Sequence, residues 1–146
     1  MLIFLLLKIS EEESMKDLTD VANERLKNDN GYINANNYKI LKVEENYCEM
    51  EGIITDTSKN PFGSVHGGYI FGLADTAAGI AAMTDNRTAL TINSSIDYFK
   101  IGNGNKLIAK AKSLKTGKNI SVIDVSVFDE DNNLIAKTSI TYFYIN

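Results

Sequence analysis

The sequence predicts an α+β fold in which one antiparallel sheet wraps around a single long helix, and two observations support this prediction. The segment from Gly67 to Met83 is the one long apolar helical run of the chain. Four extended segments follow at 88–100, 106–115, 119–129 and 134–145, joined by short polar turns. Consecutive strands with short turns pair antiparallel, so the long helix is expected to cover one face of their sheet.

The first part of the chain adds a short helix and two strands to this plan. Residues 19–27 have apolar positions spaced for one helix face, and either Thr19 or Asp20 is expected to cap this helix. A polar break follows at 28–31. Residues 38–54 have a strand pattern with a turn near 44–46, and the polar segment 55–64 is expected to be a loop.

The strand at 88–100 alternates in character along its length. Strict alternation predicts an apolar face made of Leu90, Ile92, Ile96 and Tyr98, and an opposite polar face made of Thr91, Asn93, Ser95 and Asp97. Part of this polar face is expected to meet solvent, a ligand or another subunit.

Composition limits the classes of function. The chain has 146 residues, 44% of them hydrophobic and 23% charged, as in a single globular domain. A net charge of -4 argues against a general nucleic-acid surface, which would need clustered positive charge. Cys48 is the only cysteine and His66 the only histidine, so we expect no intrachain disulfide and no zinc site of nitrogen and sulfur ligands.

Residues 1–14 resemble a targeting segment only superficially. Their apolar run is shorter than the ~20 residues that span a bilayer, and acidic residues 11–13 follow where a signal peptide would have its cleavage site. We expect 1–14 to be a poorly ordered extension, 15–146 to be the folded domain, and the protein to be cytoplasmic and not membrane-bound.

A stripe along the long helix is the first functional signal. Gly68, Gly72, Asp75 and Gly79 follow one another at steps of four, three and four, so they share one side of the helix. The glycines alone are consistent with tight packing against a strand or another helix. A carboxylate among apolar residues is costly unless it is paired, hydrogen-bonded or turned toward a polar cavity, so Asp75 is the candidate catalytic residue.

The beginning of the same helix is the second signal. The sequence His66-Gly67-Gly68 opens the helix, where free backbone N–H groups and the positive end of the helix dipole favour negative charge. Such donors stabilise the charge that develops on a reacting carbonyl oxygen, and the glycines at 67 and 68 would let a carbonyl reach the backbone. The alternative for His66 is a turn residue that hydrogen-bonds to the backbone.

Together, Asn60, Gly63, His66-Gly67-Gly68, Leu73-Ala74-Asp75 and Gly79 resemble the signature of hotdog-fold acyl-CoA thioesterases, in particular the PaaI-like branch. Segments 117–118, 127–130 and 134–136 also resemble the family's late strands. One departure follows Lys100, where many relatives have a proline and this chain has Ile101-Gly102. The resemblance implies a hotdog fold over 15–146.

The resemblance also implies roles for individual residues. Asp75 would be the general base that activates water or the nucleophile, and the Gly67 N–H would bind the thioester carbonyl. Asn60 and His66 would lie near that carbonyl or shape the turn that presents Gly67. Thr91 would help to orient the attacking water, its alternative being an ordinary strand hydroxyl.

The resemblance further implies sites between the subunits of a homodimer or homotetramer, and no cofactor beyond the CoA of the substrate. Lys115 and Lys118 flank a hairpin turn and either bind CoA phosphates or are simply solvated. The sequence leaves open whether the acyl group is aromatic or aliphatic, and whether the carrier is CoA or an acyl-carrier protein. Two other functions stay open: a non-catalytic acyl-CoA binding or sensing module, and a hotdog dehydratase or hydratase.

Overall fold

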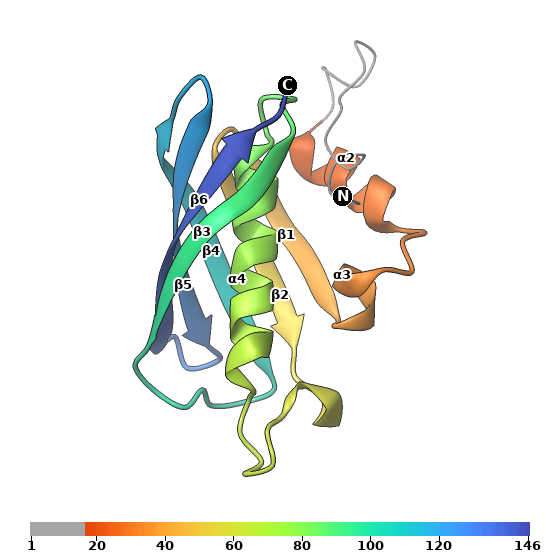
Figure 1. Cartoon of the computed structure of the whole chain (residues 1–146). Helices are drawn as coiled ribbons and strands as arrows, with labels where there is room; N and C mark the ends of the chain where they lie inside the picture. Colours follow the sequence, from red (N-terminus) through yellow and green to blue (C-terminus); the bar gives the residue numbers. More distant parts are fainter. Residues whose placement is uncertain (1–16) are drawn as a thin grey trace.

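The computed structural model describes residues 17–146, and in this range six strands form one antiparallel sheet (Figure 1). The sheet order is β1-β2-β4-β5-β6-β3. The strands are β1 (Tyr38–Glu44), β2 (Tyr47–Ile53), β3 (Ala89–Tyr98), β4 (Lys106–Thr116), β5 (Ile120–Asp129) and β6 (Leu134–Tyr144). The predicted α+β architecture is therefore confirmed. The prediction for residues 1–14 lies outside the described residues.

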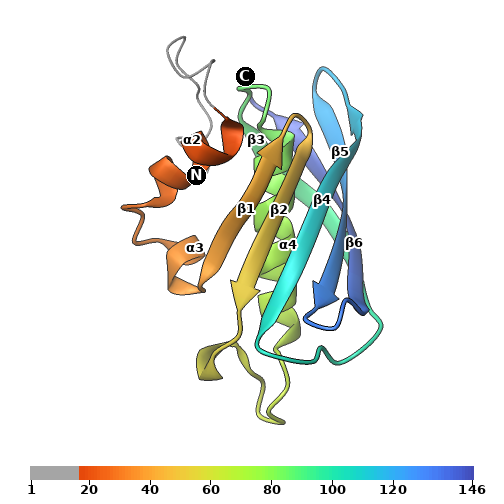
Figure 2. The ribbon, with the colours of Figure 1, turned by 180° about the vertical axis from the view of Figure 1, so that it is seen from behind.

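Helix α4 (Gly67–Ala82) runs along the concave face of the sheet and contacts all six strands. Figure 2 shows the sheet from behind, with α4 passing across its far side. The helix is rich in alanine and glycine, and most of its residues are buried. Small side chains allow the helix backbone to lie close to the strands, so the core forms between α4 and the inner sheet face.

Helix α2 (Leu18–Leu26) begins two or three residues earlier than the predicted caps imply and has a different cap. Asp17 is the N-cap, and its Oδ1 accepts a hydrogen bond from Thr19 N at 2.7 Å. The prediction of Thr19 or Asp20 as the cap was wrong because the Thr19 hydroxyl binds β1 instead, accepting from Val43 N at 2.8 Å. Helix α3 (Tyr32–Ala35) and the 3₁₀ turn η2 (Asp56–Ser58) were not predicted.

A β-bulge in β3 changes which side chains of this strand face the helix. Thr91 pairs with Tyr142 of β6 and Asn93 pairs with Thr141, so Ile92 is left without a partner. Side chains opposite buried β6 residues lie on the inner face. That face contains Ala89, Thr91, Ser94, Ile96 and Tyr98.

The predicted faces of the strand at 88–100 were therefore partly wrong. Leu90 and Ile92 are exposed and do not share the inner face with Ile96 and Tyr98. Thr91 lies inside, although strict alternation predicted it on the same face as Asn93. The extra residue of the bulge reverses the alternation on one side of Ile92, which is why a pattern of period two fails here.

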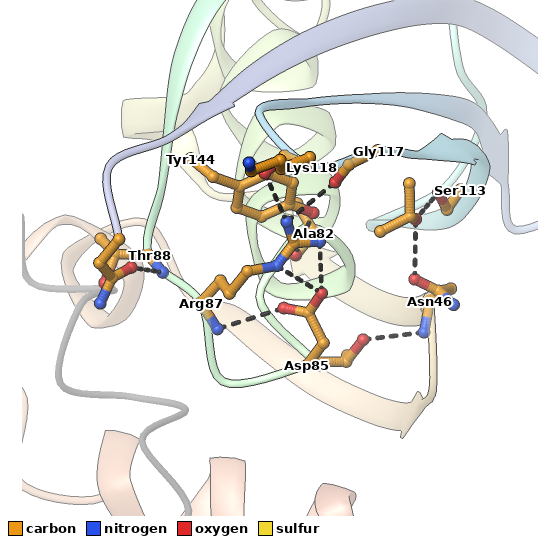
Figure 3. A network of polar contacts seen from close by, with 12 residues as sticks. Asn46, Ala82, Asp85, Arg87, Thr88, Ser113, Gly117, Lys118 and Tyr144 are labelled. Atoms are coloured by element: carbon orange, nitrogen blue, oxygen red, sulfur yellow. Dashed lines mark hydrogen bonds and ion pairs between the residues drawn. The ribbon is translucent and has the colours of Figure 1, made fainter.

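Arg87 holds the end of the sheet beyond α4 together (Figure 3). Its guanidinium donates to Gly117 O at 2.8 Å and to Lys118 O at 2.9 Å, in the turn between β4 and β5. It also forms an ion pair with Asp85 at 2.6 Å and lies 3.6 Å from the centre of the Tyr144 ring. One side chain thus joins the segment after α4, the β4–β5 turn and the last strand.

No helix in the described part of the chain is long and apolar enough to cross a membrane.

The Arg87 contacts predict a clear loss of stability on truncation. Arg87→Ala is expected to lower the free energy of unfolding by about 2 kcal/mol, because two carbonyl groups lose a charged donor and the Tyr144 ring loses its stacking partner. Urea denaturation followed by circular dichroism measures the change. Lys115→Ala, at an exposed position of the same hairpin, is the control and should be neutral; equal stability of both variants would contradict the assigned role.

Candidate active site

The loop before α4 is shaped by Asn60. Asn60 Oδ1 accepts hydrogen bonds from Phe62 N at 3.0 Å and Ser64 N at 3.2 Å. Gly63, inside this turn, has a φ of 83°, which glycine adopts without steric cost. These contacts show that the Asn60 side chain shapes the turn ahead of Gly67.

His66 is the N-cap of α4. Its Nδ1 accepts a hydrogen bond from Gly68 N at 2.8 Å, and its own N donates to Ser58 O at 2.8 Å. Because Nδ1 accepts, the proton of the neutral ring is on Nε2. This is the backbone-bonding alternative considered for His66, and it also means that the Gly68 N–H is already used by the cap.

Gly67 is the first residue of α4 and lies against Tyr98 of β3. Tyr98 Oη donates to Gly67 O at 2.8 Å, and a Cβ at position 67 would come within 3.3 Å of the Tyr98 ring. Within residues 17–146, no acceptor is recorded for the Gly67 N–H, which belongs to the first, unpaired turn of the helix. Gly67 therefore keeps the free donor that the sequence predicted.

An open cleft of about 550 Å³ adjoins this end of the helix. Its walls come from the loop before α4, the first turns of α4 and the segment after β3. The lining residues are Asn60, Phe62, Ser64, Val65, Gly67, Ile70, Tyr98, Phe99, Lys100, Ile101 and Gly102. Aromatic and aliphatic side chains dominate this list, and Phe62 is 93% exposed. The departure from the family at Ile101-Gly102 thus lies in the wall of the cleft.

Asp75 is half-buried in the middle of α4 and is held by two hydroxyl groups. Thr91 Oγ1 donates to Asp75 Oδ1 at 3.0 Å, and Tyr142 Oη lies 2.9 Å from the same oxygen. Tyr142 Oη also lies 2.8 Å from the backbone O of Asp75. No ion pair of the described residues involves Asp75, and no other residue of α4 carries a charge.

The tyrosine beside Asp75 is a site residue that the sequence did not reveal. Tyr142 lies on β6, is 2% exposed and sits opposite Thr91 in the strand register. Burial, followed by the charge of Asp75, raises the pKa of the Tyr142 phenol well above its ordinary value. The only available signal was the alternation of Ile140, Tyr142 and Tyr144 along the last strand, which indicates inward side chains but not their partner.

The structure does not bring all the predicted site residues together within one chain. Gly67 and Asp75 are eight residues apart on one helix, which corresponds to a rise of about 12 Å. Lys115 and Lys118 belong to the β4–β5 hairpin, beyond the opposite end of α4 (Figure 1). One chain therefore presents the carboxylate, the helix entrance and the two lysines as three separate places.

These groups can support hydrolysis without a further reactive side chain. A carboxylate with no cationic partner can take a proton from water or attack directly, and a helix N-terminus can stabilise an oxyanion. Cys48 is fully buried and burial raises its pKa, which makes it a poor nucleophile. Among residues 17–146, no cluster of three acidic, histidine or cysteine side chains could hold a metal ion.

Fold and site together define a class, that of an α+β hydrolase whose sheet wraps a helix carrying one carboxylate. The model of the thioesterase superfamily matches residues 62–136. An Archaeoglobus fulgidus protein that is named as an esterase by inference is 34% identical over 109 residues, which are 74% of this chain and 71% of that protein. The acyl-coenzyme A thioesterase PaaI of Escherichia coli is 29% identical over 98 residues, 66% of this chain and 70% of that one.

A solved structure adds a ligand to these similarities. A hypothetical thioesterase from Streptococcus pneumoniae, solved with coenzyme A, is 28% identical and has a TM-score of 0.72 over 75% of this chain and 87% of that one. The same protein was solved with alanine in place of an aspartate and, separately, of a threonine sixteen positions later. The present chain belongs to the thioesterase superfamily. It is a hotdog-fold thioester hydrolase, and its resemblance to PaaI-like enzymes is confirmed.

The capping geometry of His66 predicts how this position tolerates substitution. His66→Ala is expected to lower the free energy of unfolding by about 1 kcal/mol, because Gly68 N loses its acceptor. His66→Asn keeps a side-chain acceptor at the cap and should recover most of the loss. Urea unfolding compares the three proteins, and equal destabilisation by alanine and asparagine would rule out the cap as the reason for this residue.

Proposed function

We propose that the protein is an acyl-CoA thioesterase in which Asp75 is the general base or the nucleophile and the Gly67 N–H polarises the thioester carbonyl. The observation that carries the proposal is the Asp75 carboxylate, which is hydrogen-bonded by hydroxyls but has no cation beside it. As a base, Asp75 takes a proton from water while the water oxygen bonds to the acyl carbon. The C–S bond then breaks, and the CoA thiolate leaves with that proton.

The relatives support the acyl-CoA part of this proposal. PaaI of Escherichia coli is named as an acyl-coenzyme A thioesterase, and the Streptococcus pneumoniae protein holds coenzyme A. The aspartate and threonine replaced in that protein have the same separation as Asp75 and Thr91 in this chain. This spacing, with the 3.0 Å contact between the two side chains, favours Thr91 as the residue that helps to orient the water.

The complete site is proposed to form between two copies of the chain. The rise of about 12 Å between Gly67 and Asp75 is too long for one thioester carbonyl group to meet both within a chain. In the described structure β3 is an edge strand, with β6 on one side only. Pairing of two β3 strands about a two-fold axis would cover both edges and place the Gly67 of one copy near the Asp75 of the other.

The substrate parts follow from the surfaces nearest to each group. The apolar cleft beside Gly67 suits a hydrophobic acyl chain or ring, and Tyr98 and Phe99 give it aromatic surface. Asn60 and His66 set the turn that presents Gly67, and the Gly68 N–H holds the cap. Lys115 and Lys118 are exposed and become candidates for the CoA phosphates only if a second copy brings them to the site. An acyl-carrier-protein substrate would use the same carbonyl chemistry.

The other two functions fit the contacts less well. A binding module has no need of an unpaired carboxylate at the centre of its main helix. A dehydratase or hydratase would use a catalytic histidine, whereas the His66 ring caps its helix. Thiol release distinguishes hydrolysis from binding alone, and a test of crotonyl-CoA hydration addresses the hydratase.

Substitution of the carboxylate tests the proposed chemistry. Wild-type protein is expected to release CoA from at least one of acetyl-, hexanoyl- and phenylacetyl-CoA, measured with a colorimetric thiol reagent. Asp75→Asn is expected to lower kcat by about 10³-fold or more while coenzyme A still binds, because an amide neither takes a proton nor attacks. Glu49→Gln, an acidic position on β2, is the control, and undiminished turnover by Asp75→Asn would remove Asp75 from the mechanism.

Mixing two inactive variants tests the site between subunits. Gly67→Pro removes the N–H at a helix position that accepts proline. Gly67→Ala is its control, because it keeps the N–H and adds a similar Cβ against Tyr98. Gly67→Pro co-expressed with Asp75→Asn is expected to regain about a quarter of wild-type activity, because randomly paired mixed dimers each hold one intact site. A mixture no more active than its components would contradict a shared site.

A further inference from the structure

The hydrogen bonds at Asp75 reach only one of its two carboxylate oxygens. Thr91 Oγ1 donates to Oδ1 at 3.0 Å, and Tyr142 Oη approaches the same oxygen at 2.9 Å. No hydrogen bond within residues 17–146 reaches Oδ2. The two oxygens of this side chain therefore differ, one being occupied by donors and the other open.

Tyr142 is the better fixed of the two donors. It is 2% exposed on the inner face of β6, and its hydroxyl bridges the backbone O and Oδ1 of Asp75. Thr91 belongs to the edge strand β3 and is exposed. Since Tyr142 contacts both the main chain and the side chain of Asp75, it restrains the rotation of the carboxylate relative to its own helix.

We propose that Tyr142 is a positioning residue for hydrolysis, which together with Thr91 occupies Asp75 Oδ1 and leaves Oδ2 as the reacting oxygen. This inference rests on the proposed role of Asp75. Oδ2 takes the proton of the attacking water and later gives it to the departing sulfur. If Asp75 is instead the nucleophile, Oδ2 forms the bond to the acyl carbon as the C–S bond breaks and the CoA thiolate leaves. Water then hydrolyses the mixed anhydride, which releases the acid and restores the carboxylate.

Of the two side chains that hydrogen-bond to Asp75 in the described residues, Tyr142 is the one that can titrate. From β3 the contact is the neutral Thr91, and α4 has no second charged residue. Asp97 of β3 and Lys137 of β6 pair with each other in the register, and both are exposed on the outer sheet face. The phenol stays protonated, and so remains a donor, because burial and the Asp75 charge both oppose its ionisation.

A neighbouring tyrosine provides a matched control. Tyr144 lies two residues further along β6, is 5% exposed and donates its hydroxyl to Ala82 O of α4 at 2.8 Å. Tyr142→Phe and Tyr144→Phe each remove one buried hydroxyl group that hydrogen-bonds from the same strand to the same helix. The first removes a donor to a carboxylate and the second does not, so a purely structural effect should be similar in both.

The experiment measures kcat and KM separately with hexanoyl-CoA or phenylacetyl-CoA, whichever wild-type protein hydrolyses faster. In Tyr142→Phe we expect kcat to fall about tenfold, with KM nearly unchanged, because the reacting oxygen is less well oriented. Tyr144→Phe is expected to keep the wild-type kcat and KM.

An unchanged kcat in Tyr142→Phe, or the same loss of kcat in Tyr144→Phe, would overturn the proposal. Activity of wild-type protein with no effect of Tyr142→Phe rejects this inference alone, whereas absent thiol release rejects the proposed function itself. If Tyr142→Phe does not fold, difluorotyrosine at position 142 keeps the hydroxyl and makes it a stronger donor. Its kcat should then stay close to that of wild-type protein, and a tenfold loss of kcat counts against the proposal.

Discussion

The structure depends on how one carboxylate is accommodated in an apolar helix that the sheet surrounds. Helix α4 contacts all six strands, and Asp75 is its only charged residue. Burial of an unpaired charge is costly unless hydrogen bonds to the protein replace those to water. Hydroxyl groups from β3 and β6 provide those bonds without neutralising the charge. A salt bridge at this position would have made the carboxylate less available for chemistry.

The β-bulge at Ile92 is what allows β3 to take part in this arrangement. Continuous alternation back from Tyr98 would bring Leu90 and Ile92 inward and turn Thr91 outward. With one extra residue in the strand, Thr91 faces α4 while Ser94, Ile96 and Tyr98 still do so. Bulges are known to redirect side chains next to active sites, and here the redirected group is the hydroxyl that reaches Asp75.

The two ends of α4 are held by contacts of different kinds. At its beginning, His66 caps the first turn through Gly68 N, and Tyr98 binds the Gly67 carbonyl. Neither contact uses the Gly67 N–H, which stays free beside the cleft. At its far end, Tyr144 binds Ala82 O and Arg87 joins the neighbouring turn to the last strand. The rise of the helix sets the distance between its entrance and Asp75, and that distance is the reason why a complete site is proposed to need two chains.

The sequence by itself determined the long helix, the order of helices and strands along the chain, and the unusual position of Asp75. These features depend on local periodicity, turn residues and the cost of a charge in an apolar run, all of which can be read within about twenty residues. The turn formed by Asn60 and the cap formed by His66 are local for the same reason.

Only the tertiary structure decided which groups meet Asp75. Tyr142 lies 67 residues away in the chain, and its contact with Asp75 depends on how β6 is placed beneath the helix. The inward turn of Thr91 depends on a bulge that is defined by pairing with β6, and no pattern within β3 reveals it. Strand register and the packing of a helix on a sheet are set by contacts between distant segments, which is why local sequence patterns do not determine them.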